Sequence, residues 1–120
     1  MKGKVQLILA SASPRRAQLL RQLGLTFEVV PSSVPEDVFP DETPESHVRR
    51  LAREKAMEVR KSHSHAMILA GDTVVVLGDR ILGKPRDPGE AVSMLTELSG
   101  KTHRVVSGLA LSFPWGGIRD

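Results

Sequence analysis

Residues 7–16 read Leu-Ile-Leu-Ala-Ser-Ala-Ser-Pro-Arg-Arg, an apolar segment that runs directly into a helix start. Ser13 is a capping residue, and Pro14 suits the first helical turn because its φ is fixed and it has no N–H to leave unpaired. The free N–H groups of that turn, with Arg15 and Arg16 beside them, predict an anion-binding site of the kind that takes a phosphate. The alternative interpretation is a capped surface helix with two solvated arginines.

The composition is that of a small folded protein with few aromatic residues. The 120 residues suit one α/β domain spanning 1–120, and 40% of them are hydrophobic. Aromatic residues account for only 3%, so we expect neither a base-stacking surface nor a nucleic-acid partner. The net charge of +3 favours anionic ligands in general. There is no cysteine, and the apolar segment at 5–10 is too short for a signal peptide or membrane span, so a cytoplasmic protein is expected.

Three helices are expected to begin with the same signal, a capping side chain followed by proline. The three pairs are Ser13-Pro14, Thr43-Pro44 and Asp87-Pro88. The first helix should end at Gly24 and the third at Gly100, because glycine is the usual helix stop. The side chains expected to face the core are Leu19, Leu20 and Leu23 in the first helix, and Ala91, Met94, Leu95 and Leu98 in the third.

Strands are expected at 5–10, 26–30, 66–77 with an interruption, 80–82 and 102–113. The Gly78-Asp79 pair predicts a hairpin between the third and fourth of them. Because strands and helices alternate apart from this hairpin, the expected fold is a single layered α/β domain with a mixed, twisted sheet flanked by helices. Residues 31–42 hold three prolines and four acids and are interpreted as a loop over the site.

The last expected strand is followed by the turn sequence Pro-Trp-Gly-Gly at 114–117. The sequence ends three residues later at Asp120, so a hairpin without its second strand and an exposed sheet edge are expected. We therefore expect a chain truncated at its C-terminus.

Two charged residues stand where an apolar side chain is expected. In the second helix, Lys55 falls within about 30° of the centre of the apolar stripe, taking 100° per residue. It is interpreted as a cation aimed at a bound anion, or alternatively as a stem that carries its ammonium out past the core. Asp72 interrupts an apolar segment, where an unpaired carboxylate would be costly. It should meet a cation or a metal, unless Gly71-Asp72-Thr73 is simply a bend.

Further charges complete the candidate site. Lys84, in Gly83-Lys84-Pro85, follows the hairpin on a stiff loop, and Glu36 lies in the 31–42 loop. Four cations and one or two acids suit a polyphosphate with a divalent metal, because the metal and the cations together neutralise the charge on a leaving phosphate. Ser11 and Ser13 are better suited to phosphate hydrogen bonds than to nucleophilic catalysis. The histidines are not expected to be catalytic, and His47 is expected on the polar side of the second helix.

With these residues in hand, the chain resembles the Maf family of nucleoside triphosphate pyrophosphatases. The resemblance spans nearly all 120 residues and departs from the family branch's usual Ala-Asp-Thr only in having Gly71. The five matching motifs, in the family's order, are Ser11-Ala12-Ser13-Pro14-Arg15-Arg16, Leu51-Ala52-Arg53-Glu54-Lys55-Ala56, Gly71-Asp72-Thr73, Gly83-Lys84-Pro85-Arg86-Asp87 and Leu98-Ser99-Gly100-Lys101-Thr102-His103.

The resemblance implies a fold related to the inosine triphosphate pyrophosphatases, a homodimer, and hydrolysis of a nucleoside triphosphate to monophosphate and pyrophosphate with Mg or Mn. Asp72 would accept the proton of the attacking water, and Asp72 and Glu36 would hold the metal. The residues implied to bind the triphosphate are Ser11, Arg16, Lys55 and Lys84.

The resemblance also bears on the base. Arg15 and Thr73 match the dTTP and UTP branch, whereas the 7-methyl-GTP branch carries Trp and Gln at those places. A third specificity residue, a Gln in the family's C-terminal part, lies beyond the last residue of this chain. The alternatives are a 7-methyl-GTP pyrophosphatase, a regulator that binds nucleotide or nucleic acid without catalysis, and an inactive fragment.

Overall fold

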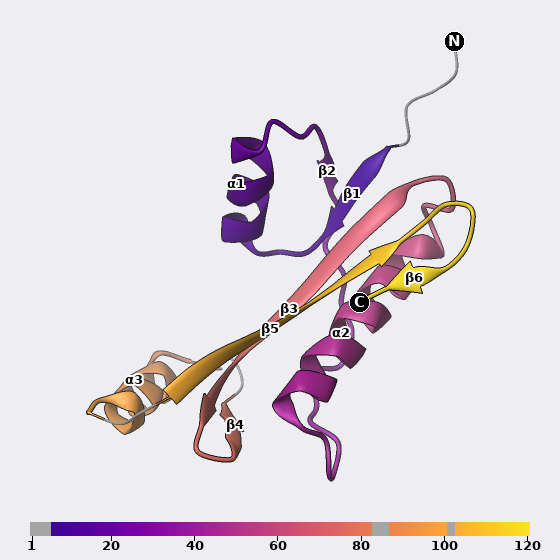
Figure 1. The fold of residues 1–120 in the computed structure, drawn as a ribbon. Helices are drawn as coiled ribbons and strands as arrows, with labels where there is room; N and C mark the ends of the chain where they lie inside the picture. Colours follow the sequence, from indigo (N-terminus) through magenta and orange to yellow (C-terminus); the bar gives the residue numbers. More distant parts are fainter. Residues whose placement is uncertain (1–5, 83–86, 101–102) are drawn as a thin grey trace.

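The computed structural model describes residues 6–82, 87–100 and 103–120, and within these ranges a mixed sheet carries helices on both faces (Figure 1). The strands are β1 (Leu7–Ala10), β2 (Glu28–Val29), β3 (Met67–Leu77), β4 (Arg80–Leu82), β5 (His103–Ser112) and β6 (Ile118–Arg119). The helices are α1 (Pro14–Gln22), α2 (Pro44–Arg60) and α3 (Pro88–Leu98).

The sheet has the strand order β2-β1-β3-β5-β6, with β4 paired to β3. β1 runs parallel to both β2 and β3, whereas β3 runs antiparallel to β4 and β5. The expected mixed α/β sheet is therefore confirmed. So is the hairpin between β3 and β4, where Gly78 takes the positive φ of 61° that a tight turn requires.

The expected interruption of the third strand is wrong. β3 is continuous over eleven residues, and its ladder with β5 runs without a break from Ile68 opposite Ser112 to Leu77 opposite His103. A turn is not needed at Asp72 because a cation from α2 meets its carboxylate. The long strand thereby carries the Gly71-Asp72-Thr73 motif in the middle of the sheet.

The helix starts follow the sequence. Ser13, Thr43 and Asp87 each accept a hydrogen bond from the backbone N–H three residues later, and the proline follows each cap. The first helix ends close to Gly24, which has a φ of 78°. These caps determine the residue at which each helix begins.

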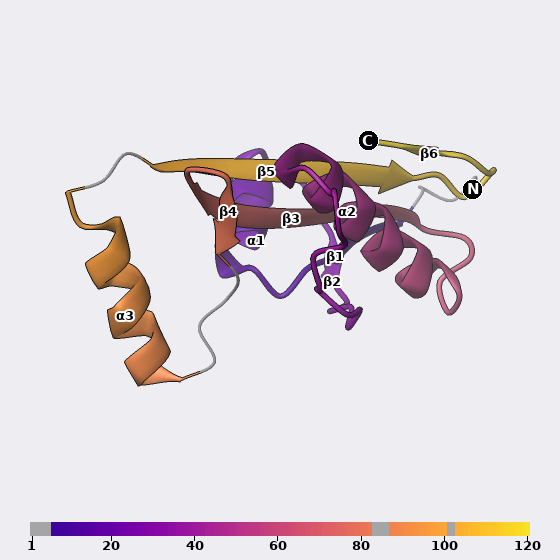
Figure 2. The same cartoon turned by 90° about the horizontal axis from the view of Figure 1, so that it is seen from below.

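α1 covers one face of the sheet and α2 covers the other (Figures 1 and 2). Ile8 and Ala10 pack with Ala52 and Ala56 of α2, whereas Leu9 packs with Leu20 of α1. Successive residues of β1 point to opposite faces, so this alternation places the two helices on opposite sides. α2 lies along β3 and β5 and makes the main core.

Some side chains expected in the core lie outside it. Of the three leucines expected to face the core from α1, only Leu20 is buried, and Leu23 is 73% exposed because it follows the last helical residue. α3 has no buried residue and projects beyond the end of the sheet (Figure 2), so its expected apolar stripe faces no layer of the described chain. The turn after Phe113 leads into β6, whose two residues do pair with the end of β5, so the expectation of a missing second strand is corrected.

Within the residues the structure describes, no helix has both the length and the apolar character needed to cross a membrane.

Candidate functional site

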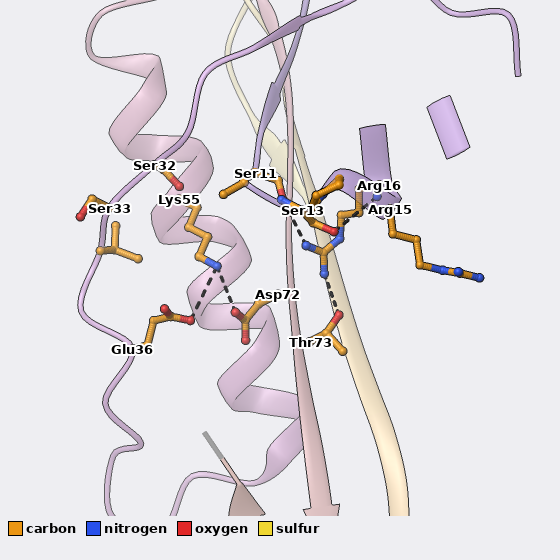
Figure 3. Close-up of a pocket in the computed structure, with 13 residues that line it drawn as sticks. Ser11, Ser13, Arg15, Arg16, Ser32, Ser33, Glu36, Lys55, Asp72 and Thr73 are labelled. Atoms are coloured by element: carbon orange, nitrogen blue, oxygen red, sulfur yellow. Dashed lines mark hydrogen bonds and ion pairs between the residues drawn. The ribbon is translucent and has the colours of Figure 1, made fainter. Parts of the chain in front are cut away.

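A cavity of about 570 Å³ opens at the carboxyl ends of β1 and β2, beside the middle of the longer strand β3. It is lined by residues from four parts of the chain that are far apart in sequence: Ser11, Ala12, Ser13, Pro14, Arg15, Arg16, Ser32, Ser33, Val34, Glu36, Lys55, Asp72 and Thr73. Most of them are polar or charged. Figure 3 shows how the side chains lie.

The strand order explains why a cavity forms here. β1 and β2 are parallel, so their carboxyl ends open at the same edge of the sheet. The chain after β1 turns into α1 on one face, whereas the chain after β2 crosses to α2 on the other face. Such a divergence leaves a crevice at the carboxyl ends of the strands, which is the usual ligand site of open α/β sheets.

Asp72 and Lys55 form a buried ion pair on the α2 side of this crevice. The Lys55 ammonium lies 3.0 Å from Asp72 Oδ1 and 3.5 Å from the backbone oxygen of Gly71. The Asp72 side chain is only 4% exposed and the Lys55 side chain 12%. Lys55 is thus aimed inward, as the helical periodicity predicts, and the Asp72 carboxylate has the cation that its burial requires.

Glu36 brings a second carboxylate to the same lysine. Its Oε1 lies 3.9 Å from the Lys55 ammonium, and the dashed lines in Figure 3 mark both ion pairs. Glu36 belongs to the loop that follows β2, so the expected position of this loop beside the site is correct. Two carboxylates and one ammonium are therefore held together at the centre of the cavity.

The residues present fit a divalent cation. Asp72 Oδ2 is buried and has no hydrogen-bond partner among the described residues, so one carboxylate oxygen lacks the partner that its burial requires. Mg²⁺ is commonly held by one or two carboxylates together with substrate phosphates, and Asp72 and Glu36 supply that number. A cluster of three or more His, Cys, Asp or Glu side chains suited to a metal is not found in the described ranges.

Arg16 occupies the α1 side of the cavity. Its two terminal nitrogens donate hydrogen bonds to Ser11 Oγ at 3.1 Å and to Thr73 Oγ1 at 2.6 Å. Its backbone N–H donates to the cap, Ser13 Oγ, at 3.4 Å. The start of α1 therefore presents a half-buried guanidinium and the helix's own first N–H groups to the same space.

Two further cations were predicted for the site, Arg15 and Lys84. Arg15 lines the cavity but is exposed, and Figure 3 shows its side chain directed away from the Asp72–Lys55 pair. Lys84 lies outside the described residues. The structure thus brings together Ser11, Ser13, Arg16, Glu36, Lys55, Asp72 and Thr73, with Arg15 at the rim.

Sequence reasoning missed Ser32 and Ser33, which also line the cavity. Ser32 Oγ is buried and, within the part of the chain described, has no hydrogen-bond partner. A signal was present in the sequence, because a serine pair follows β2 much as Ser11 and Ser13 follow β1. Parallel neighbouring strands bring such segments to the same edge.

His47 is not on the polar side of its helix, as expected, but buried at 2% exposure. Glu42 folds back onto the first turns of α2, where its Oε1 lies 2.9 Å from His47 Nδ1 and its Oε2 accepts a 2.6 Å hydrogen bond from Arg50. The Arg50 hydrogen bond lowers the pKa of Glu42 from 4.5 to about 2. This cluster attaches the end of the 31–42 loop to α2.

Comparison with known proteins identifies several relatives that share one name. Among them, proteins named dTTP/UTP pyrophosphatase from Syntrophus aciditrophicus, Myxococcus xanthus and Aquifex aeolicus are 54%, 53% and 46% identical, over 88%, 88% and 92% of this chain. These matches cover 52%, 54% and 57% of the relatives, so the chain spans about half their length.

A solved structure shares the fold. It is a nucleoside-triphosphatase / dITP/XTP pyrophosphatase from Mycobacterium abscessus, with a TM-score of 0.55 and 21% identity over 96% of this chain and 69% of that protein. A family model described as Maf-like protein matches residues 6–116. The chain therefore belongs to the Maf-like protein family.

Proposed function

We propose that this protein is a nucleoside triphosphate pyrophosphatase that hydrolyses dTTP and UTP to the monophosphate and pyrophosphate. The observation that carries the proposal is the buried Asp72–Lys55 pair beside the N-terminus of α1. A carboxylate with one uncommitted oxygen, facing cations that suit a polyphosphate, is the arrangement needed to activate water next to a phosphoanhydride. The names of the relatives support the same reaction.

In this proposal the triphosphate lies across the start of α1, bound by Ser11, Ser13 and Arg16. Asp72 Oδ2 accepts a proton from water as the water oxygen bonds to the α-phosphorus, and the bond to the bridging oxygen breaks so that pyrophosphate leaves. Lys55 holds the Asp72 carboxylate in place through Oδ1. Arg16 and Lys55 stabilise the negative charge that develops, and we assign Lys84 the same role from its motif.

A divalent cation, Mg²⁺ or Mn²⁺, would be held by Asp72 and Glu36, and would supply neutralisation of charge on the phosphates. Both carboxylates lie within 4 Å of the Lys55 ammonium, so they converge on one point of the cavity. Their joint use as ligands is part of the proposal.

Selection of the base is assigned to Arg15 and Thr73. Thr73 is exposed in the cavity, and Arg15 stands at its rim, where a base attached to a triphosphate on α1 would lie. The side chains at both places can donate hydrogen bonds, which suits a pyrimidine with carbonyl oxygens. The proposal also includes a homodimer working in the cytoplasm, where nucleoside triphosphates are available.

The test is pyrophosphate release from dTTP, UTP, 7-methyl-GTP and ATP in the presence of Mg²⁺ or Mn²⁺. The wild type should release pyrophosphate from dTTP and UTP. Asp72→Asn should lose turnover yet still bind nucleotide in calorimetry, whereas Asp79→Asn, in the exposed β3–β4 turn, should retain the wild-type rate. Wild-type protein that releases no pyrophosphate from any of these nucleotides refutes the proposal, as does full activity of Asp72→Asn.

A further inference from the structure

Gly71 lies directly under the guanidinium of Arg16. A Cβ atom added at Gly71 would stand 2.8 Å from Arg16 Nε, a distance that real Cβ atoms essentially never show, and 3.0 Å from Arg16 Cζ, which is tighter than most real Cβ contacts. It would also stand 3.0 Å from a methyl carbon of Leu109 on β5. The side chain of Arg16 can lie flat against β3 in this way only because residue 71 has no side chain.

The flat position determines which partners Arg16 reaches. Its guanidinium extends from Ser11 Oγ just after β1 to Thr73 Oγ1 on β3 (Figure 3). On the way it passes over Gly71. Gly71 and Thr73 are two residues apart on one strand and therefore face the same side of the sheet. Asp72, between them, faces Lys55 on the opposite side.

Ser107 completes this contact from the next strand. Thr73 is paired with Ser107 in the β3–β5 ladder, and their side-chain oxygens are 2.8 Å apart. Arg16 can only donate hydrogen bonds, so Thr73 Oγ1 is an acceptor toward it. Ser107 supplies a second partner for the same hydroxyl, which fixes the hydroxyl in place beneath the guanidinium.

We propose that Gly71 and Ser107 are positioning residues that hold Arg16 ready for the phosphates of the substrate. This inference rests on the proposed function for the identity of the ligand. A guanidinium has five N–H donors, and the contacts with Ser11 and Thr73 leave further donors for an anion. A cation fixed before the ligand arrives binds it more tightly, because less side-chain freedom is lost on binding.

The first test observes Arg16 without any nucleotide. In nitrogen-15 NMR spectra the held guanidinium of the wild type should rotate slowly about its Nε–Cζ bond and give separate signals for its two terminal nitrogens. Arg16→Lys assigns these signals by removing them. Gly71→Ala should merge them, and Ser107→Ala should broaden them. Gly89→Ala, a matched change at an exposed glycine of α3, should leave them unaltered. Separate Arg16 signals that persist in Gly71→Ala refute the inference.

The second test measures binding of inorganic triphosphate and of dTTP by calorimetry. Gly71→Ala should weaken both by about tenfold, a change equivalent to roughly 1.4 kcal/mol. In an Arg16→Lys background the same change should have no further effect, because the effect acts through Arg16. Equal weakening in both backgrounds refutes the inference.

The outcomes separate this inference from the proposed function. Wild-type protein that binds triphosphate with the expected Gly71→Ala effect, but releases no pyrophosphate, contradicts the proposed function and leaves the inference standing. If the wild type is active but the Arg16 signals are unaltered in Gly71→Ala, the proposed function stands and the inference is refuted. A wild type that does not bind triphosphate contradicts both.

Discussion

Asp72 is a buried carboxylate in the middle of the sheet. Its side chain is 4% exposed, and a buried carboxylate is expensive unless a charge or hydrogen bonds compensate it. The sequence predicted that it would meet a cation or a metal, unless the segment was simply a bend, and the 3.0 Å contact with Lys55 shows that it meets a cation. The pair therefore has a structural consequence that is separate from any activity.

Lys55→Met should destabilise the fold, because it leaves the Asp72 carboxylate buried without its cation. The expected loss in the free energy of unfolding is about 3–5 kcal/mol, the usual cost of breaking a buried pair from one side. Urea unfolding near neutral pH measures it. The double variant Lys55→Met with Asp72→Leu should recover most of that loss, since no buried charge remains. Equal instability of the single and double variants contradicts this account.

Gly108 marks the closest approach between α2 and β5. A Cβ atom there would lie 2.8 Å from both the carbonyl carbon and the oxygen of Val48, which are backbone atoms of α2 and cannot swing aside. Gly108→Ala should therefore push the helix from the sheet and lower the free energy of unfolding by about 1–3 kcal/mol. Gly89→Ala, on α3, provides the comparison in urea unfolding. Unchanged stability of Gly108→Ala would show that α2 is less closely packed.

The loop that carries Glu36 is attached to α2 on both sides of that residue. The backbone N–H of Ser33 donates to Glu58 Oε1 at 2.7 Å, and Arg50 donates to the backbone oxygen of Asp37 at 2.8 Å. Arg50 also lies over the ring of Phe39, 3.7 Å from its centroid. These contacts fix the loop beside Lys55.

The attachment should weaken in acid. The Arg50 hydrogen bond lowers the pKa of Glu42 from 4.5 to about 2, so its contribution to stability is complete above pH 4.5 and is lost as the pH falls toward 2. Glu42→Gln should cost roughly 1–2 kcal/mol at pH 6, and thermal unfolding should show this difference shrinking between pH 4.5 and 2. Glu45→Gln, at an exposed glutamate paired with Arg104, should change stability little. A Glu42→Gln difference that stays constant with pH contradicts the role of the ionised carboxylate.

Short sequence signals such as helix caps predicted where helices and strands lie better than they predicted how these pack together. Each cap is a side chain three residues from the N–H that it accepts, so Ser13, Thr43 and Asp87 could be identified from the sequence alone. The continuity of β3 could not, because the cation that compensates Asp72 comes from a different element. His47 was misplaced for a similar reason, since Glu42 reaches it only after the loop has folded back.

Across the whole molecule, the core lies between α2 and the sheet, and α3 stands apart from it. Leu51 of α2 is fully buried, whereas Leu95 of α3 is 67% exposed. Arg80 of β4 is ion-paired with Glu97, which attaches α3 to the hairpin. The sequence predicted an apolar stripe on α3 because periodicity shows which side is apolar, but it does not show what covers that side.

Leu51→Ala and Leu95→Ala should therefore differ strongly in stability. The first leaves a cavity in the core and should cost about 2–5 kcal/mol, whereas the second should stay within about 0.5 kcal/mol of the wild type. Urea unfolding of the two variants measures the contrast. Comparable losses would show that α3 packs against the core in solution.

The candidate site is also a property of the whole molecule, because Arg16, Glu36, Lys55 and Asp72 meet only through the strand order. The residue types and the inward direction of Lys55 were predictable from the sequence. The partners that Asp72 and Thr73 meet on opposite faces of the sheet, and the close approach at Gly71, depend on side chains of other elements and required the structure.

The central claim is that water, activated by Asp72, attacks the α-phosphorus of a nucleoside triphosphate. Hydrolysis of dTTP in water labelled with oxygen-18, followed by mass spectrometry of the products, tests it directly. The account predicts one labelled oxygen in the monophosphate and none in the pyrophosphate. Label in the pyrophosphate or in inorganic phosphate would place the attack on another phosphorus and contradict the account.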